Sequence, residues 1–101
     1  MNKVKIAAVQ MSCLGTVQQN IEKADNFVRE AAKNGARIIL LPELFETKYF
    51  CQERNYDYYN LAAAPEDNAA IRHFKKVCAE LKVVIPISFF ERSGNATFNS
   101  V

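Results

Sequence analysis

Cysteine and histidine are scarce in this chain of 101 residues, which contains three cysteines and one histidine. The cysteines, Cys13, Cys51 and Cys78, are odd in number, far apart and never in C-x-x-C spacing, which argues against a disulfide framework and a zinc site. His73 has no histidine or cysteine at ligand spacing, so we expect it to be a solvated helix residue. The sequence therefore predicts reduced thiols and no bound metal.

Long apolar runs and an excess of one charge are also absent. No apolar segment approaches the length of a membrane-spanning helix, and the first apolar run is too short for a signal peptide and is interrupted by Gln10. Thirteen lysines and arginines oppose eleven acidic residues, and the charges are interspersed rather than gathered into a stripe. We therefore expect a cytoplasmic protein with neither a membrane nor a nucleic-acid partner.

Only three glycines are present, and none belongs to a phosphate-binding loop. Neither G-x-G-x-x-G nor G-x-x-x-x-G-K-[ST] follows the first or the second predicted strand. A non-catalytic α/β module that binds a nucleotide or a partner protein is one interpretation of the chain. The missing loop counts against the nucleotide-binding form of that interpretation.

Half of the residues are hydrophobic, and their spacing predicts a βαβ unit at the amino terminus. The mostly apolar run at 4–9 predicts a largely buried strand. Thr16 and Gln19 match a capping box, after which apolar residues recur at helical spacing until Gly35, which suits the end of a helix. The aliphatic residues at 38–41 predict a second strand, buried on both faces and parallel to the first.

The second half of the chain is predicted to add a helix, a strand and a hairpin. The helix covers residues 65–81, and the strand at 83–90 has an irregularity at its proline. A turn at 91–95 leads into a fourth strand. Because the chain ends inside this strand, we expect residues 1–101 to be part of a domain that continues beyond Val101.

Glu43 follows the strand at 38–41, at the carboxyl end where open α/β sheets bind ligands. A partly desolvated carboxylate has a raised pKa, which suits a general base. The competing interpretation is an ordinary polar residue that opens a loop. The next segment, 44–59, is long and rich in aromatic residues, which predicts a pocket wall or lid, or else rings that fill a core or an oligomer interface.

Three short motifs make the chain similar to a known family. They are Leu-Pro-Glu at 41–43, Tyr-Phe-Cys-Gln at 49–52 and Ser-Phe-Phe-Glu at 88–91. With these motifs the whole chain resembles the carbon–nitrogen hydrolases of the nitrilase superfamily, and the last two point to its carbamoylputrescine branch. The resemblance implies an α/β fold, the amino-terminal part of a four-layer αββα sandwich, and a homo-oligomer that stacks such sandwiches.

The resemblance also implies a mechanism. Glu43 matches the family's general base, which takes a proton from a cysteine thiol and returns one to departing ammonia. The family's lysine and nucleophilic cysteine lie in segments after Val101, so Cys51 and Lys48 do not match those roles. Residues 1–101 alone are therefore expected to be inactive. No cofactor is implied.

The implied substrate is a small carbamoyl or amide compound, most specifically N-carbamoylputrescine, cleaved to putrescine, carbon dioxide and ammonia in polyamine biosynthesis. Tyr49, Phe50 and Tyr56 are the predicted substrate-binding residues, because an aliphatic amine needs an apolar slot. A ureidopropionase or an ω-amidase is the alternative within the superfamily. A non-catalytic truncated chain that only pairs with partner subunits is a further alternative.

Overall fold

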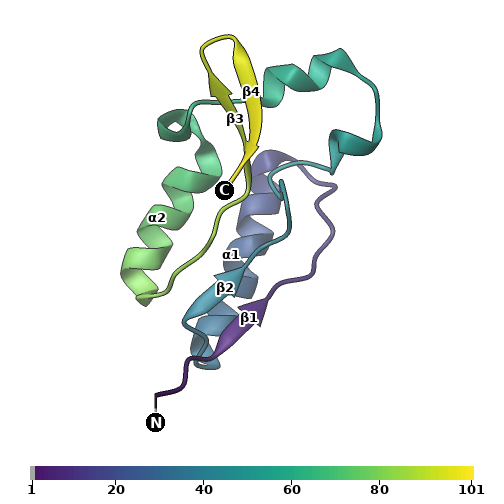
Figure 1. Ribbon diagram of the computed structural model, residues 1–101. Coiled ribbons are helices and arrows are strands. Elements are labelled where there is room, and N and C mark those ends of the chain that lie inside the picture. Colours follow the sequence, from purple (N-terminus) through teal and green to yellow (C-terminus); the bar gives the residue numbers. More distant parts are fainter. Residues whose placement is uncertain (1) are drawn as a thin grey trace.

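The first two strands and the helix between them form the predicted βαβ unit. In the computed structural model, which describes residues 2–101, strand β1 (Ile6–Ala8) pairs in parallel with β2 (Ile38–Leu40), and helix α1 (Val17–Lys33) connects them. Figure 1 shows α1 running behind this two-stranded sheet. Since the strands are parallel, their carboxyl ends open on the same side, where the candidate site lies.

Both ends of α1 follow the local sequence signals. The backbone N–H of Gln19 donates to Thr16 Oγ1 at 3.1 Å, and the N–H of Thr16 donates to Gln19 Oε1 at 2.9 Å, so the capping box is confirmed. After the helix, Gly35 has a φ of +95°, which a residue with a Cβ rarely adopts. Short-range chemistry therefore sets where α1 begins and ends.

The β1–β2 sheet is covered on one face only. Ile39 is fully buried, whereas Leu40 is 52% exposed and Ile6 is 71% exposed. For residues 2–101, the predicted burial of β2 on both faces and the predicted large burial of β1 were therefore wrong. The physical reason is that α1 and α2 (Ala69–Leu81) both contribute to the one core that contains Ile39, and they leave the opposite face largely uncovered.

Helix α2 begins at Ala69 rather than at residue 65, because Asn68 is its N-cap. The Asn68 side chain accepts a hydrogen bond from the N–H of Ile71 at 2.9 Å. The residues from Pro65 to Asp67 form a separate 3-10 turn, η3. The predicted apolar stripe is confirmed, since Phe74 and Val77 are buried in the core and Cys78 packs against it.

His73 on α2 contacts α1, although the sequence predicted a solvated residue. Its Nε2 lies 2.5 Å from Asp25 Oδ2, and Asp25 also accepts a hydrogen bond from Arg29. Arg29 in turn forms an ion pair with Glu80 on α2. The expectation of simple solvation was therefore wrong, because the helices pack side by side and bring the His73 ring to an acidic group on the neighbouring helix.

The predicted continuous strand at 83–90 is divided in two. Val84 bridges in parallel to Ile38 beside β2, and the chain then passes Pro86 before β3 (Phe89–Ser93) begins. Proline has no backbone N–H to donate to a strand neighbour, which explains the interruption. Strand β3 pairs with β4 (Ala96–Ser100) in an antiparallel hairpin, so the turn is at 94–95 and not at 91–95.

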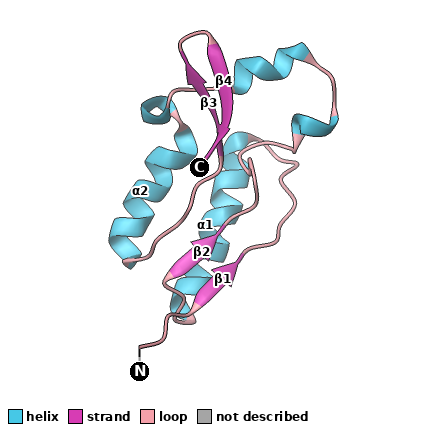
Figure 2. Cartoon of the chain, viewed as in Figure 1, coloured by secondary structure: helices cyan, strands magenta, loops and turns pink. Residues whose placement is uncertain are grey.

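The segment between β2 and α2 is irregular, as Figure 2 shows, apart from short helical turns. The turns are η1 (Phe50–Gln52), η2 (Tyr56–Leu61) and η3. Aromatic residues of η1 and η2 lie beside Phe90 of β3, and together they line one of the two hollows described below. Within residues 2–101, no helix combines the length and the apolar character needed to cross a membrane.

Candidate active site

Glu43 lies just beyond the carboxyl end of β2, as predicted. Its Oε1 accepts a hydrogen bond of 2.5 Å from the Asn99 side chain, so β4 contributes a group to the same place. The Glu43 side chain is exposed in residues 2–101, whereas partial desolvation was expected from its strand-end position.

The backbone beside Glu43 is strained. Leu44 has a φ of +50°, which is uncommon for a residue other than glycine and costs about 1–2 kcal/mol. Two contacts hold Leu44 in this conformation: its side chain is buried, and its N–H donates to Ser88 Oγ at 3.0 Å. The turn therefore aims Glu43 away from the core. The sequence has no signal for this conformation, because leucine is not a residue that favours it.

Glu46 has a structural role that the sequence interpretation missed. Its Oε1 accepts a hydrogen bond from the N–H of Ala70 at 2.8 Å, and its Oε2 accepts one from the Asn68 side chain at 3.1 Å. A carboxylate is favourable at the amino terminus of a helix, where backbone N–H groups lack partners. Both oxygens of Glu46 are therefore engaged at the start of α2, while Glu43 borders the hollow.

Asn20 on α1 ties the loop after β1 to the Glu43 segment. Its side chain, buried inside the protein, donates to the backbone oxygens of Cys13 and Glu46 at 3.1 and 2.9 Å. The same side chain accepts a hydrogen bond from the N–H of Gly15 at 3.1 Å. Three chain segments are thus fixed by one amide, and the candidate site rests on them.

Glu43 and Tyr49 border the same hollow, which has a volume of about 600 Å³. Cys13 and Lys48 also contribute to its wall. The Glu43 carboxylate, followed by the Cys51 thiol, raises the pKa of the Tyr49 hydroxyl, because a second negative charge beside them is unfavourable. The hollow therefore joins a carboxylate and a neutral phenol that can donate a hydrogen bond.

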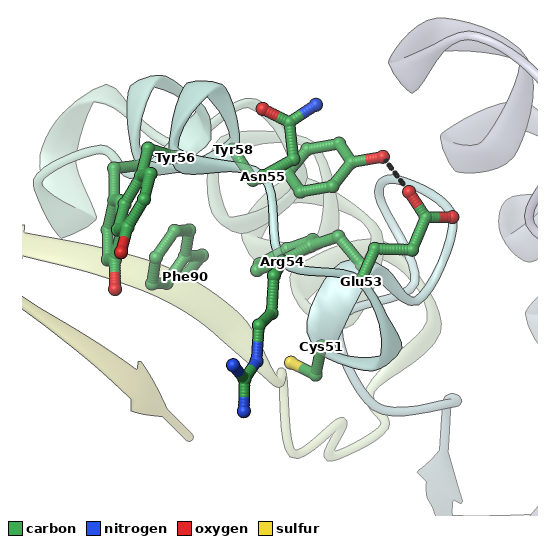
Figure 3. A pocket seen from close by; sticks show the side chains of 9 residues that line it. Cys51, Glu53, Arg54, Asn55, Tyr56, Tyr58 and Phe90 are labelled. Atoms are coloured by element: carbon green, nitrogen blue, oxygen red, sulfur yellow. Dashed lines mark hydrogen bonds between the residues drawn. The ribbon is translucent and has the colours of Figure 1, made fainter.

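Phe50 and Tyr56 border a different, aromatic cavity of about 460 Å³ (Figure 3). Phe50 is buried, with its ring 5.0 Å from Phe90 and 5.4 Å from Tyr58. Tyr56 is 85% exposed and stacks on Tyr59 at 6.2 Å. The three residues chosen from the sequence are therefore divided: Tyr49 shares a hollow with Glu43, while the other two line the aromatic cavity.

One side of the aromatic cavity is charged. Glu53 accepts hydrogen bonds from Lys48 Nζ at 2.8 Å and from the Tyr58 hydroxyl at 2.6 Å. These bonds lower the pKa of Glu53 and raise that of Lys48. Arg54 follows Glu53 and lines the cavity as well (Figure 3). The Lys48 ammonium is thus engaged in an ion pair with Glu53.

The three thiols differ in their surroundings. Cys51 is exposed, whereas Cys13 and Cys78 are half-buried. Burial raises the pKa of both half-buried thiols, which makes them weak nucleophiles. Among residues 2–101, no cluster of three histidine, cysteine or acidic side chains is arranged to hold a metal ion.

Known proteins resemble this chain over almost its whole length. N-carbamoylputrescine amidase of Oryza sativa subsp. japonica is 46% identical over 99% of this chain and 33% of its own length. Citrullinase of Francisella tularensis subsp. tularensis is 40% identical over 100% of this chain and 35% of its own length. The chain thus spans about a third of the length of these relatives.

A solved structure shares the fold. Saccharomyces cerevisiae Nit3, a member of branch 10 of the nitrilase superfamily, superposes with a TM-score of 0.76 at 19% identity, over 95% of this chain and 37% of that protein. At this identity the likeness concerns the fold alone, and it confirms the predicted nitrilase-type α/β architecture. The sequence profile of the carbon-nitrogen hydrolase family matches residues 5–101. The chain therefore belongs to the carbon-nitrogen hydrolase family.

Proposed function

We propose that the protein hydrolyses the ureido C–N bond of N-carbamoylputrescine, with Glu43 as the general base. The observation that carries this proposal is the position of Glu43: it follows a parallel strand, is aimed by a strained turn and borders an open hollow. The 46% identity to an N-carbamoylputrescine amidase supports the choice of substrate. The cytoplasm and polyamine biosynthesis are the proposed setting.

In this mechanism Glu43 removes the proton from a cysteine thiol, and the thiolate attacks the ureido carbonyl. A lysine ammonium stabilises the oxyanion of the tetrahedral intermediate. The intermediate expels ammonia, which takes its proton from Glu43, and water then hydrolyses the carbamoyl-enzyme to give putrescine and carbon dioxide. We assign the thiol and the ammonium to family segments that follow Val101, so the domain of residues 1–101 continues in the active protein, a homo-oligomer.

The substrate is proposed to lie between the two hollows. Tyr49 would face the ureido group beside Glu43, because both border the same space. Phe50 and Tyr56 would contact the aliphatic amine from the aromatic cavity, where ring faces favour an ammonium. All three residues belong to the segment between β2 and α2.

A second candidate substrate is citrulline. The 40% identity to a citrullinase over the whole chain favours it specifically. Citrulline carries the same ureido group and would need the same base. A ureidopropionase, an ω-amidase and a non-catalytic subunit are the other outcomes that the assay must separate.

The test is ammonia release by the protein that the complete reading frame encodes. N-carbamoylputrescine, citrulline, 3-ureidopropionate and an ω-amide are compared at equal concentrations. The proposal predicts that kcat/KM is highest for N-carbamoylputrescine. A higher value for 3-ureidopropionate or the ω-amide would reassign the branch, and absence of ammonia from all four would favour the non-catalytic interpretation.

A further inference from the structure

The charges that line the aromatic cavity are not balanced. Glu53 is engaged by Lys48 and by the Tyr58 hydroxyl, so it has little capacity for another cation. Arg54 is exposed, and no ion pair within residues 2–101 involves its guanidinium. Figure 3 shows this guanidinium and the Glu53 carboxylate extending in different directions. The cavity therefore presents a positive charge that is available to a ligand.

Aromatic faces also line this cavity. Tyr56 and Tyr59 are stacked, and the Tyr59 ring is 6.3 Å from that of Phe90. Such faces attract an ammonium group, whereas the planar guanidinium of arginine forms paired hydrogen bonds with a carboxylate. An ammonium and a carboxylate can therefore be bound side by side, which is the arrangement at the head of an α-amino acid.

The aromatic cavity adjoins the hollow of Glu43. Tyr49 borders the Glu43 hollow, and Cys51, two residues further along the chain, borders the aromatic cavity. Phe50, which directly follows Tyr49 in the chain, also lines the aromatic cavity, so the two spaces meet at consecutive residues. A ligand with a ureido group at one end can thus place its other end beside Arg54.

Citrulline and N-carbamoylputrescine differ at that other end only. Citrulline has a carboxylate on the carbon that bears the amine, where N-carbamoylputrescine has a hydrogen. We propose that Arg54 is a specificity residue that binds this carboxylate, so that the protein hydrolyses ureido amino acids of the citrulline type in addition to N-carbamoylputrescine. This inference rests on the proposed hydrolase function.

The experiment compares Arg54→Gln with wild type on both substrates, in the protein from the complete reading frame. Loss of a charge-assisted, paired hydrogen bond should lower kcat/KM for citrulline about tenfold or more, mainly through KM. The value for N-carbamoylputrescine should change by less than about twofold, because no carboxylate is present. Arg54→Lys should restore part of the citrulline activity, since it keeps the charge but not the planar fork. Arg72→Gln, an exposed arginine on α2, is the matched control.

The outcomes separate this inference from the proposed function. Hydrolysis of N-carbamoylputrescine without any hydrolysis of citrulline, or an equal effect of Arg54→Gln on both substrates, overturns the role of Arg54 and leaves the proposed function intact. If neither substrate releases ammonia, the proposed function fails, and citrulline binding is measured by NMR titration instead. Binding that is weakened in Arg54→Gln then supports the inference, and binding that is absent or unchanged overturns it.

Discussion

The side chain of Asn99 donates a hydrogen bond of 2.5 Å to the Glu43 carboxylate, and it thereby joins the end of β4 to the end of β2. The two strands belong to different sheets, so the position of Glu43 depends on how the sheets are arranged. The hydrogen bond uses Oε1 of Glu43 and does not involve Oε2. Glu43 is therefore held at one oxygen and available at the other, which suits a base that must both stay in place and accept a proton.

Glu43→Gln should remove activity without unfolding the protein. Gln keeps an oxygen that can accept from Asn99 but cannot act as a base, so kcat should fall by at least about a hundredfold. Stability should change by less than about 0.5 kcal/mol because the side chain is exposed. Ammonia release and urea unfolding measure the two effects, and Glu30→Gln on the exposed side of α1 is the control. Activity near that of wild type would remove Glu43 from its assigned role.

Glu46→Ala, unlike Glu43→Gln, should lower the stability of the protein. The substitution removes both hydrogen bonds at the start of α2, so the free energy of unfolding should fall by about 1–3 kcal/mol. Glu46→Gln should lose less, because one acceptor oxygen remains. Urea denaturation followed by circular dichroism gives the values. A loss as small as that of the Glu30→Gln control would show that the cap contributes nothing.

Ser88→Ala should loosen the turn that carries Glu43. Without the hydroxyl, the N–H of the buried Leu44 has no acceptor from Ser88, which costs about 1–2 kcal/mol. Because Leu44 is then less firmly held at a positive φ, we expect kcat to decrease as well. Ser88→Thr keeps a hydroxyl and should restore most of both losses, while Ser93→Ala at the exposed end of β3 should cause neither. A loss of stability with unchanged kcat would separate the turn from catalysis.

The contact between α1 and α2 should weaken in acid. Burial acts to raise the pKa of Asp25, but hydrogen bonds from His73 and Arg29 outweigh it and hold the pKa below the ordinary value of 3.8. A carboxylate whose pKa is lower in the folded state adds stability above pH 3.8, and this stability is lost as the pH falls through the lower folded value.

Asp25→Asn should therefore destabilise the protein by about 1–2 kcal/mol at pH 7, and the difference from wild type should shrink below pH 3.8. Urea unfolding at a series of pH values measures this difference. The exposed Asp67 provides the control, Asp67→Asn. A difference that stays constant down to pH 2 would mean that the contact does not depend on the Asp25 charge.

The features that the sequence predicted well are those with local causes. The capping box of Thr16 and Gln19, the positive φ of Gly35 and the hairpin turn at Gly94 each depend on residues next to one another. The position of Glu43 also followed from a local pattern, an aliphatic run that ends at a proline. These local signals were sufficient to predict the order of the helices and strands along the chain.

The features that the sequence did not predict depend on distant contacts. The exposed face of β1 and β2 follows from which elements are present to cover it, and an aliphatic run does not reveal that. The sequence has no signal for the role of Glu46, because its partners at the start of α2 are more than twenty residues away. The separation of Tyr49 from Phe50 and Tyr56 depends on how the 3-10 turns fold back, for which the segment has no periodic pattern.

The buried amide of Asn20 makes three segments behave as one cooperative unit. The loop that contains Cys13 and Gly15, the backbone of Glu46 and helix α1 are all joined by this side chain. Opening any one of them leaves a buried amide group without a partner, which makes partial opening unfavourable. The backbone amide protons of these segments should therefore exchange with solvent at similar rates. The segments that support the candidate site should unfold together with α1 rather than before it.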